Sequence, residues 1–158
     1  MSILIKVLSL ALFSTFVFAG EEKVTLPNST KQQNIKTWAP TPLELQNALK
    51  VTNEFISEYK EGNSSPGWDL VSDDLKGSVS KDEWEAVFSV LKNSYGERKS
   101  SEFNRAIKTN KLPSGLAGDI ILVILIAEFE KEKIGETLTL ISKNGVWYLA
   151  SYNYQVIG

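Results

Sequence analysis

The stretch TLTLISKNGVWYLASYNYQVI, residues 137–157, decides the fold because it predicts two antiparallel strands and the turn between them. β-Branched and aromatic residues dominate both halves of the stretch, and such residues favour strands. Between the halves stands Asn144-Gly145, the dipeptide that favours a two-residue type I′ hairpin turn. The sequence therefore predicts strands over residues 137–143 and 146–157.

The register of this hairpin assigns each side chain to one face of the sheet. With Lys143 opposite Val146, strict alternation puts Trp147 on one face among leucines, and we assign that face to the helices. The opposite face is aromatic and rich in threonine, which is typical of a half-exposed or partner surface. Its side chains are Thr137, Thr139, Ile141, Tyr148, Ala150, Tyr152 and Tyr154.

Two further strands are predicted upstream of the hairpin. Residues 103–107 alternate between larger side chains and polar neighbours, and residues 119–130 form a long run rich in Ile, Val and Leu. Within the long run, residues 120–126 are apolar on both faces, although helices can cover only one. The cover of the other face is left open between a second copy of the domain, neighbouring tyrosines and the N-terminal arm.

Helices are predicted before the strands. Thr41 with Glu44 and Ser80 with Glu83 each form a capping box, so a helix begins at each position. Apolar residues then recur at three- and four-residue steps, which is the pattern of an amphipathic helix. The glycines expected to end these two helices are Gly62 and Gly96.

A shorter helix is predicted between these two, opened by Ser65-Pro66 and ended near Gly77. Three helices are thus followed by four strands, which indicates the α+β class with the helices packed on one face of an antiparallel sheet. We expect a single domain over residues 41–158. The preceding arm, residues 20–40, mixes polar and charged residues without periodicity, and we expect no stable element there.

Residues 1–19 have the three parts of a secretory signal peptide. Lys6 precedes an apolar stretch, residues 7–18, and Ala19 is the small residue at the cut, so the mature chain is expected to begin at Gly20. A membrane anchor is the alternative, but polar residues interrupt the stretch and a span needs about 18 or more apolar residues. We therefore expect an exported protein, periplasmic or secreted, without a membrane span after signal cleavage.

The composition excludes several classes of chemistry. The chain has no Cys and no His, which removes disulfides, reactive thiols, His-based triads and most zinc and copper sites. Lys and Arg number 17 against 19 Asp and Glu, without a dense basic run, so we expect no nucleic-acid partner. We also expect no cofactor and no metal. The acidic clusters Asp69, Asp73, Asp74 and Glu128, Glu130, Glu132 are interpreted as solvated charge.

Three tryptophans, Trp68, Trp84 and Trp147, are expected to face the interior between helices and sheet. Core packing is one interpretation. The other is that they line a ligand pocket, with Glu136 or Arg105 as the polar group at its mouth. Separately, Tyr148, Tyr152 and Tyr154 lie on the predicted outer face, where aromatic side chains favour a homodimer interface.

A wider pattern comprises Trp68-Asp69, Ser78-Val79-Ser80, Trp84, Leu112-Pro113, Phe129, residues 136–140, Trp147 and Tyr152. It resembles a family of small exported bacterial domains of unknown function. The order of helices then sheet is similar to the cone-shaped fold of the nuclear transport factor 2-like superfamily, which implies a curved sheet and a cleft under the helices. That superfamily includes isomerases and dehydratases with a pocket carboxylate, and also members without catalysis.

Only Glu136 offers such a carboxylate on the Trp147 face, and its place near a strand end predicts contact with water. We assign no catalytic residue and expect a non-catalytic, exported binding or accessory domain. Its expected partners are a second copy, an envelope protein or a small apolar ligand. A small-ligand isomerase or dehydratase that uses a cleft carboxylate is the alternative.

Overall fold

The computed structural model describes residues 35–158, so the expected signal peptide and residues 20–34 of the arm lie outside the described residues. Helices α1 (Pro42–Lys60), α2 (Asp73–Lys76) and α3 (Lys81–Tyr95) come before the four long strands. These are β2 (Arg98–Lys111), β3 (Ala117–Phe129), β4 (Lys133–Lys143) and β5 (Val146–Val156). The α+β class is confirmed, and no helix within residues 35–158 is long and apolar enough to cross a membrane.

The sheet of the described chain has five antiparallel strands in the order β1-β2-β3-β4-β5, not the four expected. The extra strand, β1 (Thr37–Trp38), pairs Thr37 with Thr109 of β2. The Thr109 hydroxyl also donates a hydrogen bond to the Lys36 carbonyl at 3.0 Å. The expectation that the arm has no stable element through residue 40 is therefore wrong. A two-residue strand is too short to show a period, and only its distant partner holds it.

Both capping boxes are confirmed. In α1 the Thr41 N–H donates to Glu44 Oε2 at 2.8 Å, and the Glu44 N–H donates to the Thr41 hydroxyl at 3.3 Å. Ser80 and Glu83 make the same reciprocal pair at the start of α3. These bonds satisfy backbone donors that have no partner inside the helix, which is why both helices begin where the sequence predicts.

The predicted middle helix is broken into two pieces, a 3₁₀ helix at Trp68–Leu70 and the single turn of α2. Between them Val71 is extended and forms a parallel bridge with Leu149 of β5. The Ser72 N–H donates to the Leu149 carbonyl at 2.9 Å, and the Ser72 side chain caps α2. A contact with the edge strand thus replaces two helical residues, so the prediction of one helix is wrong.

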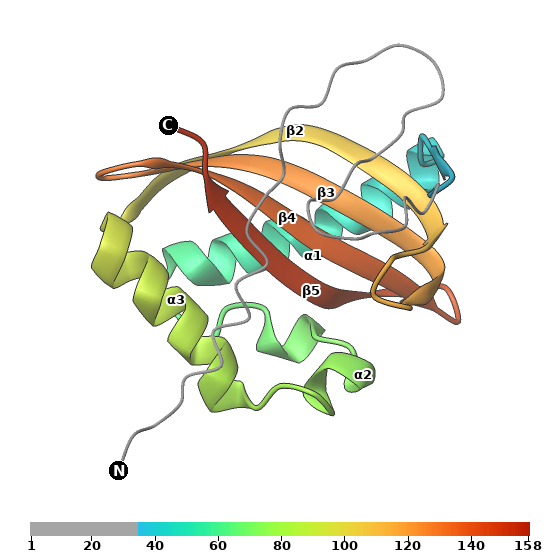
Figure 1. Cartoon of the computed structure of the whole chain (residues 1–158), viewed down its shortest axis with the longest axis horizontal. Helices are drawn as coiled ribbons and strands as arrows, with labels where there is room; N and C mark the ends of the chain where they lie inside the picture. The colour runs from blue at the N-terminus through green and yellow to red at the C-terminus, as the bar shows by residue number, and fades with distance from the viewer. Residues whose placement is uncertain (1–34) are drawn as a thin grey trace.

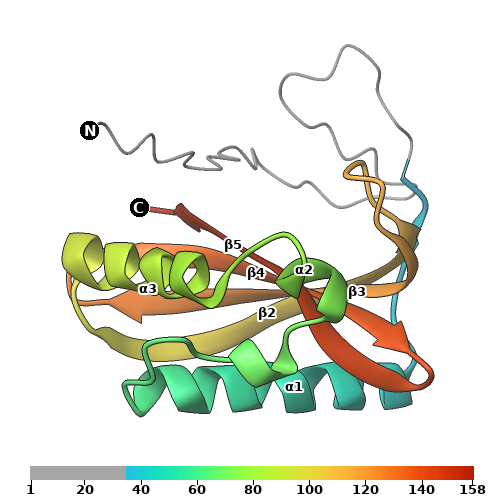
Figure 2. The same ribbon diagram turned by 90° about the horizontal axis from the view of Figure 1, so that it is seen from below.

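Helices lie beside the sheet in two places. Helix α1 runs along one face, here called the inner face, and contacts β2, β3 and β5 (Figures 1 and 2). Helices α2 and α3 lie at the β5 side of the sheet (Figure 1). The core between helices and inner face includes Phe55, Trp84, Phe88, Leu91, Val123, Leu138, Leu140 and Leu149.

The hairpin turn has the predicted form. Lys143 pairs with Val146, and both turn residues have positive φ, 53° at Asn144 and 79° at Gly145. This is the type I′ geometry that the Asn-Gly dipeptide favours.

A β-bulge in β5 changes the register beyond the turn. Leu140 lies opposite Leu149, but Thr139 lies opposite Ser151, so Ala150 is an extra residue. Side chains after the bulge therefore point to the other face than strict alternation predicts. Tyr152 and Tyr154, expected outside, pack against the core, and only Tyr148, opposite Ile141, keeps its predicted outer position.

Candidate functional site

A fully enclosed ion pair occupies the inner side of the sheet. The side chains of Glu136 in β4 and Arg98 at the start of β2 are 0% and 1% exposed. The Arg98 guanidinium donates to both Glu136 oxygens, at 2.8 and 2.6 Å, and its Nε donates to the Ser101 hydroxyl at 2.7 Å. The Tyr152 hydroxyl, turned inward by the bulge, donates to Glu136 Oε1 at 2.6 Å. Water does not reach this carboxylate, so the predicted solvent contact of Glu136 is wrong.

Aromatic rings hold the arginine in place. The guanidinium carbon of Arg98 lies 5.0 Å from the centre of the Tyr59 ring and 5.9 Å from that of Phe129. A cation over a ring face gains electrostatic stabilisation, which grows when water is excluded. The chain has two arginines, Arg98 and Arg105, and a buried carboxylate on the helix face requires a cationic partner. The need of Glu136 for a cationic partner could have pointed to Arg98 in the sequence. From the sequence we selected Arg105 and missed Arg98.

Burial governs the ionisation of this cluster. Burial raises the pKa of Glu136, while the Arg98 charge and the hydrogen bonds from Tyr152 and Arg98 act against that rise. Burial also raises the pKa of Tyr59 to about 12 and that of Tyr152 well above its usual value. Tyr152 is therefore a protonated donor at neutral pH. The Glu136 carboxylate accepts three hydrogen bonds and is 0% exposed, so a substrate can reach it only if the surrounding side chains move.

The three candidate tryptophans all lie on the helix side. Trp84 is 5% exposed and its indole N–H donates to the Pro66 carbonyl at 2.9 Å. Its ring centre lies 6.3 Å from that of Trp68, which packs against the core, and Trp147 is buried in the same core. Rings of Phe55, Phe88 and Tyr152 pack against one another beside Trp84.

The opposite, outer face of the sheet carries an open groove of about 390 Å³. All five strands contribute to it, and its lining is mostly apolar. Among its lining residues are Leu122, Ile124 and Ile126 of β3, Ile107 of β2 and Ile157 after β5. Polar groups are fewer: Asn104, Arg105, Thr37, Thr109, Thr137 and Gln155.

Arg105 belongs to this groove and not to the tryptophans. A register shift between Phe103 and Arg105 places Arg105 opposite Ile124 on the outer face, while Phe103 lies opposite Leu125. The structure therefore separates the expected pocket residues: Glu136 and the three tryptophans lie inside, and Arg105 lies outside. Regular alternation does not reveal such a bulge.

Gly135 lets the Ile157 side chain pack closely against β4 at the wall of the groove. A Cβ atom at Gly135 would lie 3.0 Å from Cγ2 of Ile157 and would have to displace it. The volume falls within the roughly 300–1,000 Å³ of small-molecule sites, which combine apolar walls with a few polar groups. The groove can therefore hold an apolar ligand, or one apolar segment of a protein.

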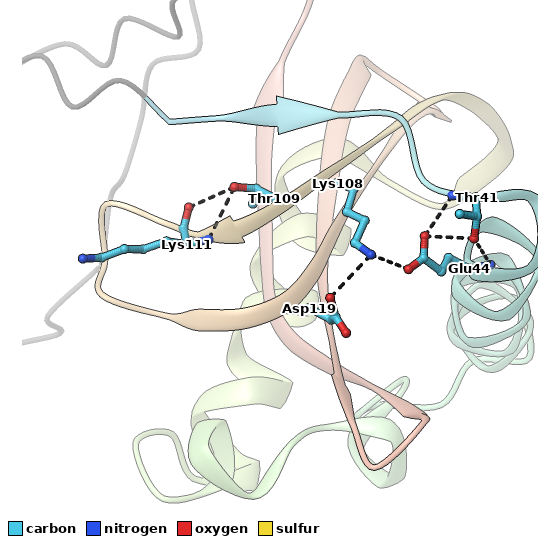
Figure 3. A network of polar contacts seen from close by, with 6 residues as sticks. All are labelled: Thr41, Glu44, Lys108, Thr109, Lys111 and Asp119. Carbon is cyan, nitrogen blue, oxygen red and sulfur yellow. Dashed lines mark hydrogen bonds and ion pairs between the residues drawn. The ribbon is translucent and has the colours of Figure 1, made fainter.

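A charged network fastens the start of α1 to β2 and β3 (Figure 3). The Lys108 ammonium bonds the Glu44 carboxylate of the capping box and lies 3.4 Å from Asp119 Oδ1. The hydrogen bond raises the pKa of Lys108 and lowers that of Glu44, so both groups stay charged at neutral pH. On the adjacent residue, the Thr109 hydroxyl oxygen accepts a hydrogen bond from the Lys111 N–H at 3.4 Å and helps to hold the end of β2.

Within residues 35–158, no three acidic side chains converge in a way that could hold a metal ion. The predicted acidic clusters include ion-paired members: Asp74 with Lys143 at 2.7 Å and Glu130 with Lys99 at 2.8 Å.

Comparisons with known proteins agree with this fold. A cystatin-like protein of unknown function from Nostoc punctiforme is 13% identical with a TM-score of 0.52, over 75% of this chain and 95% of that chain. An NTF2-like protein of unknown function from Shewanella baltica is 14% identical with a TM-score of 0.50, over 75% of this chain and 98% of that chain. Such identities show a shared fold alone. No curated protein matches the chain in sequence, whereas the model of a family described as "Protein of unknown function (DUF4019)" matches residues 52–152.

Proposed function

The chain belongs to the DUF4019 family of unknown function, and from that premise we propose that it is an exported, non-catalytic domain that binds an apolar ligand in the outer groove. The observation that carries the proposal is the contrast between the two faces. The outer face has an open, mostly apolar groove of about 390 Å³, whereas the acidic group on the inner face is enclosed.

The enclosed ion pair supports binding over catalysis. A general base must come within hydrogen-bond reach of a substrate proton, with a pKa near the working pH. Glu136 has the burial that raises a pKa, but Arg98 and Tyr152 already bond both of its oxygens. The carboxylate is also closed to solvent, so a substrate could reach it only if the side chains that enclose it moved. The arrangement therefore favours a structural role for Glu136 over the isomerase or dehydratase alternative.

The lining indicates the chemistry of the ligand. Leu122, Ile124 and Ile126 form a row at every second residue of β3, so an elongated apolar group gains contact along the row. Arg105 in β2, which lies opposite Ile124 of the row, can orient a polar end of the ligand. We therefore propose an elongated apolar molecule with one polar end as the ligand class.

The test is titration of the full chain with the apolar fluorophore N-phenyl-1-naphthylamine. Ile157→Asp places a carboxylate in the wall of the groove and is expected to weaken probe binding about ten-fold, or roughly 1.4 kcal/mol. Val156→Asp is the matched control, because Val156 and Ile157 are adjacent and similarly exposed, 47% and 43%, but only Ile157 lines the groove. Equal affinities of the two variants would contradict the proposal.

A further inference from the structure

One end of the groove is formed by the first residues that the structure describes. Ile35 and Thr37 line the groove on the β1 side, and Gln155 and Ile157 line it on the β5 side. Residues 20–34, the part of the expected mature chain that precedes Ile35, are therefore joined directly to the groove. A short tether of this kind gives the segment an effective concentration at the groove in the mM range. The segment can therefore compete with a free ligand for the groove.

The sequence of this segment fits the groove. Among residues 20–34 the apolar side chains are Val24, Leu26 and Pro27, in the order Val24-Thr25-Leu26-Pro27. In an extended chain Val24 and Leu26 point to the same side, as Ile124 and Ile126 do in β3. Nine residues lead from Leu26 to Ile35 and span about 30 Å when extended. Five strands spaced about 4.8 Å apart are only about 19 Å wide, so Leu26 can reach across the width of the groove to the row on β3.

We infer that residues 24–26 of the same chain occupy the outer groove, with Val24 and Leu26 packed on the apolar row of β3. Glu21 and Glu22, just ahead of this segment, have the charge opposite to that of Arg105 on the groove wall. This contact covers the outer side of the long strand, which is apolar on both faces. As a consequence that depends on the proposed function, the segment competes with the ligand and sets its apparent affinity.

A second copy is the other candidate cover, and the bulge weakens its case. The expected homodimer rested on residues 120–126, which are apolar on both faces, and on three tyrosines. Of these tyrosines, Tyr152 and Tyr154 face the core and Tyr148 alone stays outside. Binding of the arm does not depend on outer tyrosines, because Val24 and Leu26 provide the apolar contact and the tether keeps them near the groove.

Disulfide trapping tests the inference directly, because the chain has no cysteine of its own. In the full chain, Leu26→Cys is combined with Thr137→Cys on the groove wall, and in a matched control with Val90→Cys, half exposed on α3. Under mild oxidation the groove pair is expected to form a disulfide within one chain at least about ten-fold faster than the control. Equal rates would overturn the inference. A disulfide between two chains would also overturn it and would assign the groove to a second copy.

The competition has its own readout. Leu26→Asp is expected to bind N-phenyl-1-naphthylamine several-fold more tightly than the unaltered chain, while Thr25→Asp, at the neighbouring position that points the other way, changes affinity less than about two-fold. Unchanged affinity in Leu26→Asp would overturn the competition. Trapping without probe binding by any variant would leave the segment in the groove and refute the proposed ligand. Probe binding without trapping would support the proposed ligand and exclude the segment from the groove.

Discussion

The substitution Arg98→Met tests how the buried ion pair stabilises the fold. Methionine is close to arginine in length but removes the guanidinium, so three donated hydrogen bonds and the contacts with the Tyr59 and Phe129 rings are lost. Glu136 keeps only the hydrogen bond from Tyr152. Removing one partner of a buried pair costs about 3–5 kcal/mol, and we expect a loss of that size in the free energy of unfolding.

The double variant Arg98→Met with Glu136→Leu separates two contributions to the free energy of unfolding. One is the cost of burying an unpaired charge, and the other is the net stabilisation by the ion pair. An apolar replacement of a whole buried pair is often neutral or stabilising, because neither charge then needs desolvation. The double variant is therefore expected to regain most of the stability that Arg98→Met loses. The two substitutions should be strongly non-additive, as expected for side chains in direct contact.

Acid should rescue the single variant. Burial raises the pKa of Glu136 above its ordinary value of 4.5, and Arg98→Met removes the charge that opposes this rise. A group whose pKa is higher in the folded than in the unfolded state stabilises the fold at pH values below its unfolded-state pKa. That stabilisation is lost as the pH rises through its folded-state pKa. Arg98→Met should therefore lose less stability at about pH 5 than at about pH 8.

Urea titration followed by tryptophan fluorescence measures these free energies, since the chain has four tryptophans. A loss below about 1 kcal/mol for Arg98→Met would refute the reasoning. A double variant as unstable as the sum of the two single variants would refute it too. Either result would mean that the carboxylate finds water or another partner in the folded chain.

Further predictions concern other parts of the chain. Trp84→Ala should cost roughly 3–5 kcal/mol in urea titration, because it empties a buried aromatic site; a cost below about 1 kcal/mol would indicate an exposed, binding tryptophan. Gly145→Ala should cost about 1 kcal/mol in the same assay, because φ is 79° and nothing lies within 4 Å of the added Cβ, so only backbone strain is measured. The intact mass of the exported protein should correspond to a chain that begins at Gly20, and a chain still beginning at Met1 would exclude the signal peptide.

The sequence by itself determined the features that depend on near neighbours. Thr41 and Glu44 are three residues apart, and their reciprocal bonds set the start of α1 without help from the rest of the chain. Asn144-Gly145 likewise specifies its turn, because both residues tolerate positive φ. The order of helices then strands follows from the change in apolar period, so the fold class was predictable.

Only the tertiary structure decided which side chains meet. The β-bulge at Ala150 turns Tyr152 inward. The apolar and polar pattern around Ala150 gives no sign of this bulge. Arg98 and Glu136 are 38 residues apart, and their pairing depends on the register of β2, β3 and β4. Strand β1 depends in the same way on Thr109. Period and propensity describe neighbours along the chain, whereas the buried ion pair and the outer groove arise from contacts between strands, where a shift of one residue exchanges the two faces.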